Sequence, residues 1–225
     1  MKYINTVMGR FVERPNRFIA HVEIDNRIEI VHVKNTGRCR ELLIPGVLVV
    51  LEKSDNEKRK TAYDLVMVYK EGIGWVNIDS QMPNALVREW LEKKPIEFED
   101  IELIKPEYKY GDSRIDFYLE SSGRKILIEV KGVTLERDGI CYFPDAPTER
   151  GIKHILELVK AKEVGYEAFL AFVIQMNGVS MVKANVETHR AFGEALEAAV
   201  NAGVNVLMLP CAVSSDEIFI VEKNM

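Results

Sequence analysis

A carboxylate and an amine lie two residues apart near the end of the apolar segment ILIEVKG, residues 126–132. Because side chains alternate between the two faces of a strand, Glu129 and Lys131 should project from the same face. The preceding segment SRIDFYLE, residues 113–120, carries Asp116 and is joined to it through a Ser-Ser-Gly turn. A hairpin closed at this turn places Asp116 roughly opposite Glu129. The spacing therefore predicts that the two acids converge at one rim of a sheet, with Lys131 beside them.

Two carboxylates that converge in this way form a site for a hard divalent cation. Mg²⁺ and Mn²⁺ prefer oxygen ligands, and the backbone carbonyl of Val130 offers a third oxygen beside Asp116 and Glu129. A cation held there polarises a phosphodiester and lowers the pKa of a bound water. Lys131 would orient or activate that water, or stabilise charge on the phosphoryl oxygens. The alternative is a solvated ion pair, because Glu-x-Lys arises often in a chain with 29% charged residues.

The first 80 residues show short strand patterns joined by polar turns, and no useful length of helical spacing. Period-2 alternation is clear in RFIAHVEI and RIEIVHV, and the Asp25-Asn26 pair between them predicts a tight hairpin turn. The predicted strands cover residues 17–24, 27–33, 47–53, 61–70 and 74–79. Five or six strands in so short a segment favour a small closed barrel of the OB type.

After Ser80 the pattern changes to helices and strands in alternation. Apolar residues at helical spacing predict helices over residues 83–94, 146–165 and 187–203. Strands are predicted over residues 107–111, 113–120, 124–133, 167–174, 204–210 and 217–223. The order is one helix, three strands, then helix and strand twice, with a closing strand. This change of pattern predicts two domains, residues 1–80 and 81–225.

The second predicted helix carries cations that are candidates for phosphate binding. Arg150, Lys153 and His154 lie at i, i+3 and i+4 and therefore share one face. We expect the opposite side to be buried through an apolar stripe of Ile152, Ile155, Leu156 and Val159. A solvated helix face is the alternative, because Glu149 and Glu157 dilute the positive charge.

The first domain has its own candidate contacts for nucleic acid. Lys58, Arg59 and Lys60 form a basic run in a predicted turn, and Arg38 and Arg40 lie near another turn. OB barrels bind nucleic acid through cations that meet phosphates and aromatic side chains that stack on bases. A hairpin loop that only improves solubility is the alternative explanation for the basic run.

The net charge, the cysteines and histidines, and the length of the apolar runs limit the kinds of function that this chain can have. The net charge of the 225 residues is −5, so no global positive field indicates a nucleic-acid partner, although a local patch suffices for binding. Three separated cysteines without a CxxC pair, and four histidines without metal-ligand spacing, offer no zinc framework. The cysteines favour reduced thiols in a cytoplasmic setting. No apolar run reaches the ~20 residues that a membrane-spanning helix needs.

Six segments together closely resemble the sugar fermentation stimulation protein A (SfsA) family. They are NTGR (35–38), SDNEKRK (54–60), SQMPNALV (80–87), SRIDFYLE (113–120), ILIEVKGVTLE (126–136) and YFPDAPTERGIKHILEL (142–158). The resemblance covers nearly the whole chain. It implies an N-terminal OB-like barrel, a C-terminal PD-(D/E)XK nuclease-like domain with a mixed sheet flanked by helices, and association with DNA.

Through this resemblance the nuclease motif falls on Asp116, Glu129 and Lys131, with Ile115 in place of the proline in the motif's name. Many such folds also use an acid from the first helix. Glu89 is the candidate, but it falls away from the apolar stripe of that helix, which favours a surface position. Asn84, at the helix start, is the other candidate polar neighbour of a metal.

Three functions remain open from the sequence. The site residues favour a Mg²⁺- or Mn²⁺-dependent nuclease of DNA, with the barrel feeding the substrate to the site. A DNA-binding transcriptional regulator of sugar metabolism that keeps a nuclease fold without using it is the alternative. An interaction module for RNA or protein is the third, because the chain is net acidic. Homodimers are common in this superfamily, so a homodimer is a further option.

Overall fold

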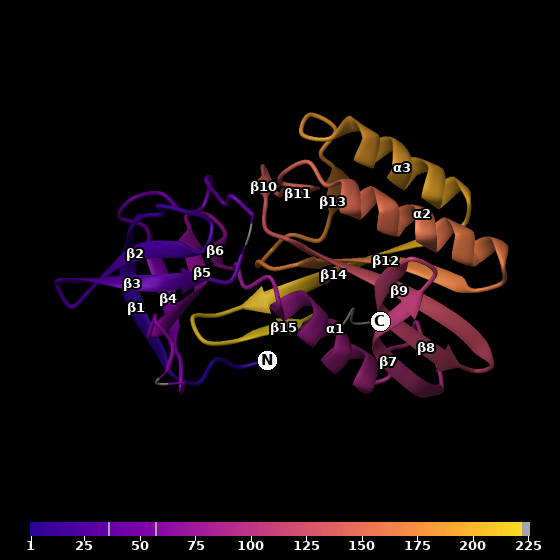
Figure 1. Ribbon diagram of the computed structural model, residues 1–225, viewed down its shortest axis with the longest axis horizontal. Helices are drawn as coiled ribbons and strands as arrows, with labels where there is room; N and C mark the ends of the chain where they lie inside the picture. The colour runs from indigo at the N-terminus through magenta and orange to yellow at the C-terminus, as the bar shows by residue number, and fades with distance from the viewer. Residues whose placement is uncertain (36, 57, 222–225) are drawn as a thin grey trace.

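The protein forms two domains that lie side by side in a computed structural model, which describes residues 1–35, 37–56 and 58–221 (Figure 1). The all-β domain contains the N-terminal part of the chain, and the larger domain combines a sheet with three helices. This confirms the predicted fold class of an OB-like barrel followed by a mixed sheet flanked by helices.

The N-terminal sheet has six strands in the order β3-β2-β1-β4-β5-β6. They are β1 (Thr6–Glu13), β2 (Ile19–Ile24), β3 (Arg27–Val33), β4 (Leu48–Lys53), β5 (Tyr63–Lys70) and β6 (Gly74–Asn77). A parallel pairing of β3 with β5 closes five of them into a barrel. Asp25 and Asn26 both have positive φ, 49° and 61°, as a type I′ hairpin turn requires.

The C-terminal sheet also has six strands, in the order β15-β14-β12-β9-β8-β7. Its elements are α1 (Met82–Glu92), β7 (Ile101–Tyr110), β8 (Ser113–Ser121), β9 (Arg124–Val133), α2 (Glu149–Glu163), β12 (Glu167–Ile174), α3 (Arg190–Asn201), β14 (Asn205–Val213) and β15 (Ile218–Ile220). The pairings of β7, β8 and β9 are antiparallel, and those of β9, β12 and β14 are parallel. Helices α2 and α3 cover one face, and α1 covers the other (Figure 1).

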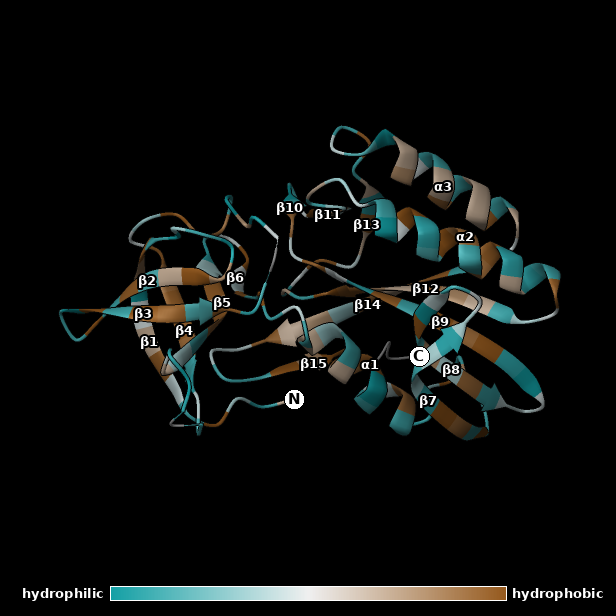
Figure 2. Ribbon diagram, in the orientation of Figure 1, coloured by the Kyte–Doolittle hydropathy of each residue, from teal (hydrophilic) through white to brown (hydrophobic). Residues whose placement is uncertain are grey.

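Hydrophobic segments recur along the strands of both domains in Figure 2. In β9 the two faces serve two cores, because Leu127 packs with the residues under α2 while Ile126 and Ile128 pack with those under α1. This two-sided burial explains why the segment reads as almost continuously apolar. It also means that a charged residue in β9 is placed inside the domain.

Several predicted boundaries were wrong. Strand β1 was not expected, and β7 begins well before the predicted residues 107–111. A small sheet of β10 (Glu136–Arg137), β11 (Ile140–Phe143) and β13 (Val182–Ala184) was also not expected. The end of the predicted strand 217–223 lies outside the described residues.

The predicted buried stripe of α2 was partly wrong. Leu156 is 47% exposed, whereas His154 is buried together with Ile155 and Leu158. Because α2 packs on both the sheet and α3, its apolar residues spread over more than one face. His154 therefore does not share an outer face with Arg150 and Lys153, as the sequence pattern suggested.

A buried polar joint connects the two domains. The Asn77 amide N–H donates to the Gln175 carbonyl at 2.9 Å, and the Gln175 side chain donates back to Asn77 Oδ1 at 2.8 Å. Asn77 Nδ2 also donates to the Tyr3 hydroxyl at 2.8 Å. A second link is the ion pair of Lys70 on β5 with Glu136 on β10. The buried hydrogen bonds between Asn77 and Gln175 thus join the two domains, and separating the domains would leave these polar groups short of partners.

Among residues 1–35, 37–56 and 58–221, the structure has no helix whose length and apolar character would let it cross a membrane.

Candidate active site

Asp116 lies where the pairing of β8 with β9 ends. The last paired residues are Phe117 and Ile128. Beyond this pair the Asp116 side chain replaces the backbone as hydrogen-bond acceptor, because its Oδ2 accepts the Val130 N–H at 2.7 Å. Asp116 Oδ1 accepts Asn84 Nδ2 of α1 at 2.8 Å. These contacts fix both carboxylate oxygens, and each oxygen keeps a lone pair for a further ligand.

Glu129 projects from β9 into the interior and is only 1% exposed. Its Oε1 contacts both Lys131 Nζ at 2.5 Å and His154 Nδ1 of α2. Arg150 Nε donates to His154 Nε2 at 3.4 Å, so the ring proton resides on Nδ1 and points at Glu129. In contrast, Glu129 Oε2 is buried and has no hydrogen-bond partner among residues 1–35, 37–56 and 58–221. The arrangement therefore holds one oxygen of Glu129 and leaves the other available.

The two carboxyl groups have pKa shifts of opposite sign. Burial raises the pKa of Asp116 above its ordinary value, and the nearby charge of Glu129 raises it further. Burial alone would also raise the pKa of Glu129, but the hydrogen bond with His154 and the charge of Lys131 outweigh it and hold this pKa below its ordinary value. The neighbours of Glu129 thus favour its anionic form, whereas burial and Glu129 disfavour ionisation of Asp116, a cost that a bound cation would offset.

The donor set fits a Mg²⁺-like cation. The N–H and C=O of one strand residue point to the same edge, so the Val130 carbonyl faces the edge at which its N–H meets Asp116. The candidate ligands are thus Asp116, Glu129 Oε2 and that carbonyl. Mg²⁺ commonly takes only one or two carboxylates and fills its octahedron with water. Among the described residues, no group of three or more His, Cys, Asp or Glu side chains could hold a metal, so a site here depends on the carbonyl and water.

The other residues predicted for this region lie in different places. Glu89 is outside the site, because it pairs with Lys93 at 3.0 Å and with the Met1 ammonium at 3.2 Å. Lys153 is exposed and donates to the Asp112 carbonyl at 3.1 Å, and Arg150 is exposed above His154. Both remain accessible to a phosphate beside the site.

In the barrel, the predicted basic run divides. Lys58 and Lys60 are exposed, whereas Arg59 forms two hydrogen bonds with Asp64 at 2.8 and 2.6 Å. Asp64 also pairs with His32 and Lys34. Burial alone would raise the pKa of Asp64, but these contacts outweigh it and lower the pKa to about 2. Arg59 therefore stabilises the barrel, and within the described part of the chain Lys58 and Lys60 form no salt bridge.

Arg38 lies on the loop between β3 and β4, and its exposed side chain faces solvent. A Cβ placed on Gly37 would lie 2.5 Å from Asp145 Oδ2, so this barrel loop touches the segment that precedes α2. Two of the segments that carry the family resemblance, around residues 35–38 and 142–148, thus meet at the domain interface.

Sequence reasoning missed the partner of Glu129 and the role of Gln175. His154 appeared only as a cation on a helix face, and nothing in its spacing indicated which strand it would meet. Gln175 has one signal, since it is one of only two glutamines in the chain and directly follows β12. A Cβ on Gly132 would contact its side chain, so Gln175 packs closely against the residue after Lys131.

Comparison with known proteins agrees with this architecture. The family model described as "SfsA N-terminal OB domain" matches residues 12–78. The model described as "Sugar fermentation stimulation protein RE domain" matches residues 81–217, more than half of the chain. The chain belongs to the sugar fermentation stimulation protein family. The sequence had indicated this family through its motifs, and the match confirms it.

Members of the sugar fermentation stimulation protein family align along nearly their whole length with this chain. Two proteins named "Sugar fermentation stimulation protein homolog" are each 56% identical to it. The one from Desulfitobacterium hafniense aligns over 97% of this chain and 94% of its own length, and the one from Ruminiclostridium cellulolyticum over 100% and 98%. A solved structure, that of Pyrococcus furiosus SfsA in complex with Ca²⁺, is 30% identical and superposes with a TM-score of 0.87, covering 99% of this chain and 97% of that one.

Proposed function

We propose that this protein is a nuclease that hydrolyses phosphodiester bonds of DNA with Mg²⁺ or Mn²⁺ bound by Asp116, Glu129 and the Val130 carbonyl. The observation that carries the proposal is the buried, unpartnered Oε2 of Glu129. Burying a charged oxygen without a partner is costly, so a ligand for it is expected. In this proposal residues 1–80 form the nucleic-acid-binding domain and residues 81–225 the catalytic domain.

Each side chain has a distinct task in the proposed reaction. A divalent cation at these oxygens would supply Lewis acidity toward the scissile phosphate and acidify a water. Lys131 presents its ammonium beside Glu129, where it can donate to a phosphoryl oxygen as charge develops on it. His154 holds Glu129 Oε1, and Oε2 is left without a hydrogen-bond partner among the described residues. Asn84 holds Asp116 in the same manner from α1.

Two further findings support the proposal. The Pyrococcus furiosus SfsA structure contains Ca²⁺, another hard divalent cation that takes oxygen ligands. The barrel is of the OB class, whose members use loops and an exposed sheet face to bind nucleic acid. Arg150 and Lys153 on α2 are exposed, so they are accessible to a phosphate backbone bound beside the site.

The test is a cleavage assay on the purified protein. Plasmid, linear duplex, single-stranded DNA and RNA are each incubated with Mn²⁺, Mg²⁺ or EDTA. We expect metal-dependent cleavage that falls by at least ~100-fold in Lys131→Ala, the loss typical of a removed proton-transfer or charge-stabilising group. Lys93→Ala is the matched control, because it removes the lysine of another Lys–Glu pair on the exposed face of α1. Activity that survives in Lys131→Ala, or in EDTA, would refute the proposal.

The alternative is a DNA-binding regulator that does not cleave. It is favoured by one observation: Glu129 is already paired with Lys131 and His154, so the fold does not require a cation there. In that case the same substrates would show retarded mobility without cleavage, and affinity would fall steeply with salt. The RNA lane of the assay tests the third option, and light scattering during size exclusion tests for a homodimer.

A further inference from the structure

A concave pocket with an unusual concentration of arginines lies on the barrel. It has a volume of about 420 Å³ and is formed by the end of β1, the turn that follows it, and the loop between β3 and β4. Arg14, Arg17, Arg38 and Arg40 line it, over a floor that includes Phe11 and Leu43. We call it the arginine pocket. The volume falls within the range of roughly 300–1,000 Å³ that small-ligand sites occupy.

The arginine side chains of the arginine pocket form no salt bridges within the described part of the chain. None of its four guanidinium groups takes part in an ion pair there, whereas Arg59 of the same barrel is paired with Asp64. The one acid in the lining, Glu13, is paired with His21 at 2.9 Å. A chain with a net charge of −5 thus keeps four unpaired arginines around one concavity, which favours an anionic ligand.

The arginine pocket is built in advance by Arg14. Its Nη1 donates to the carbonyls of Gly37 and Arg38 at 2.7 and 2.9 Å, and its Nη2 donates to those of Arg17 and Asn35 at 2.7 and 2.5 Å. These bonds tie the two loops together through neutral acceptors, so the positive charge persists. A pre-formed site loses less entropy when a ligand binds.

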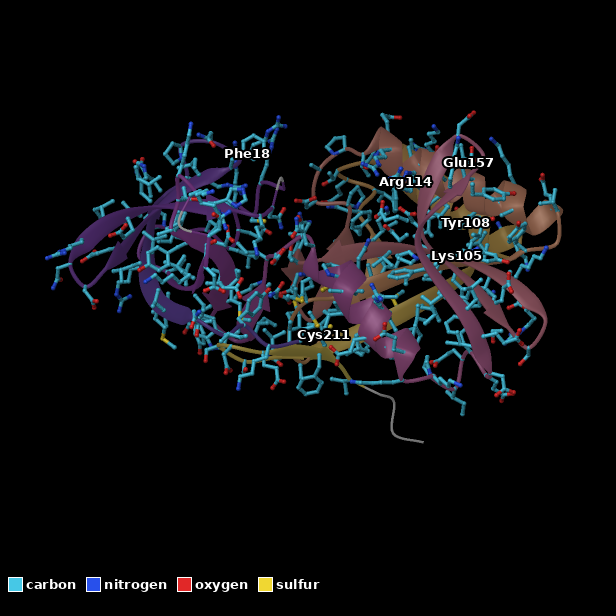
Figure 3. All side chains as sticks on the ribbon, turned by 60° about the horizontal axis from the view of Figure 1, so that its bottom comes forward. Phe18, Lys105, Tyr108, Arg114, Glu157 and Cys211 are labelled. Carbon is cyan, nitrogen blue, oxygen red and sulfur yellow. The ribbon has the colours of Figure 1, made fainter. Side chains whose placement is uncertain are left out.

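Two features indicate a nucleic-acid strand as the anion. Guanidinium groups match phosphate oxygens in a bidentate geometry. Beside the pocket, Phe18 exposes 45% of its surface at the rim of the barrel, and the Arg17 guanidinium lies 4.8 Å from its ring centroid (Figure 3). Cations that meet phosphates next to an exposed aromatic ring are the combination that binds single strands. A concavity, unlike a flat patch, accepts a single unpaired nucleotide.

The position of the arginine pocket connects it to the candidate active site. Its loop residues Gly37 and Arg38 lie close in the chain to the lining of a smaller pocket of about 110 Å³ at the domain interface. That second pocket is lined by Asn35 on the barrel side and by Gly132 and Tyr142 on the other side. Gly132 directly follows Lys131. The barrel loop that carries two of the arginines therefore also lines a pocket that it shares with the strand of the proposed site.

We propose that the arginine pocket binds one nucleotide of a single-stranded nucleic acid and anchors the strand that the interface leads to Asp116 and Glu129. The anchoring rests on the observed pocket, and only the delivery step rests on the proposed nuclease function. The pocket, and not the exposed Lys58–Lys60 turn, is then the main contact of the barrel with nucleic acid.

The experiment compares two double variants that remove the same charge from the same barrel. They are Arg17→Ala/Arg40→Ala in the pocket and Lys58→Ala/Lys60→Ala outside it, and all four side chains are exposed. Fluorescence anisotropy measures the affinity of the full chain for a labelled ~15-nucleotide single strand in EDTA, a length near the upper site size of an OB fold. Titrations between about 50 and 200 mM salt give the number of phosphates contacted.

We expect the arginine variant to bind at least ~10-fold more weakly and to lower the salt slope by about 1.4, since each phosphate contact to a single strand contributes about 0.7. The decrease in the logarithm of the affinity should be less than about a third as large for the lysine variant as for the arginine variant. Equal weakening by both variants would show a general charge effect and overturn the inference, as would unchanged affinity of the arginine variant. Arg17→Lys/Arg40→Lys keeps the charge, so partial recovery in it separates lost contacts from misfolding.

The outcome can be distinguished from the fate of the nuclease proposal. Normal cleavage together with unchanged strand affinity in the arginine variant would refute the pocket alone. Loss of affinity in that variant, in a protein that cleaves no substrate, would support the pocket and refute the nuclease.

Discussion

Adding a divalent cation should raise the melting temperature of this protein. Burial and the charge of Glu129 raise the pKa of Asp116, so keeping Asp116 ionised at neutral pH costs stability when no cation is bound. A bound cation offsets that cost and gives the buried Glu129 Oε2 a partner. Cation at 100 times its Kd stabilises a fold by about 2.7 kcal/mol. In a protein of this size each kcal/mol shifts Tm by about 2–4 °C, so we expect a rise of ~5–10 °C.

The assay is differential scanning calorimetry of EDTA-dialysed protein with increasing Mn²⁺ or Mg²⁺. Glu129→Gln is the informative variant, because its amide oxygen can keep the bonds to His154 and Lys131 while its NH₂ group replaces Oε2. It should lose most of the cation-dependent rise when compared with its own metal-free Tm. Glu89→Gln is the control, since Glu89 lies on the surface in an ion pair with Lys93 and should keep the full rise.

Two results would refute the reasoning. The wild-type Tm could stay constant up to millimolar concentrations of every divalent cation tested, which would mean that the two carboxylates do not form a metal site. Alternatively, Glu129→Gln could keep the full rise, which would place the cation elsewhere. Neither result depends on whether the protein cleaves DNA.

Three other predictions concern stability and the domain interface. Asp64 has a pKa lowered to about 2, so its contribution to the free energy of unfolding is present above about pH 4 and is lost as the pH falls toward 2. Asp64→Asn should therefore destabilise the protein by ~2 kcal/mol at pH 6 and by much less near pH 2, as measured by urea unfolding. Gly132→Ala should destabilise the protein by ~1–3 kcal/mol and reduce any cleavage, because the new Cβ would contact the Gln175 side chain. A Tm equal to that of the wild type would contradict this, because it would show that the Gln175 side chain moves away without cost. Lys70→Met should destabilise by ~2 kcal/mol because it leaves the buried Glu136 unpaired, and adding Glu136→Gln should recover part of the loss in the same unfolding assay.

The sequence predicted the parts of the site that lie on one hairpin. Alternation in residues 124–133 places Glu129 and Lys131 on one face, and the two-residue turn at Ser122 and Gly123 sets the register that brings Asp116 opposite. Both signals are local, because strand period and turn length are properties of neighbouring residues. The metal and catalytic roles of these residues stay predictions.

The contacts made by α2 could not be obtained in this way. Its pattern gave an apolar stripe that included Leu156, which the structure exposes, and it left out His154, which the structure buries against Glu129. A helix packed between a sheet and another helix buries more than one face, so periodicity does not identify the face that meets the site. The position of His154 depends on how α2 docks, and no local signal specifies that.

Strand β1 was missed for a related reason. Gly9 interrupts its apolar alternation, and an isolated glycine usually weakens a strand. In the barrel a Cβ at this position would lie 2.5 Å from Val22 Cγ1 and 2.9 Å from the Glu23 carbonyl oxygen. The glycine is thus required by a neighbouring strand that only the closed barrel supplies.

The buried hydrogen bonds of Asn77, Gln175 and Tyr3 restrict the motion of the two domains relative to each other. Hinging the two domains apart would break both hydrogen bonds between Asn77 and Gln175 and leave these buried amide groups short of partners, at about 1–3 kcal/mol for each group. The distance between the arginine pocket and the carboxylates of Asp116 and Glu129 is consequently fixed. A nucleic-acid strand bound in the arginine pocket would therefore reach Asp116 and Glu129 after a fixed number of nucleotides. The length of the cleavage products would then reflect the distance between the two sites.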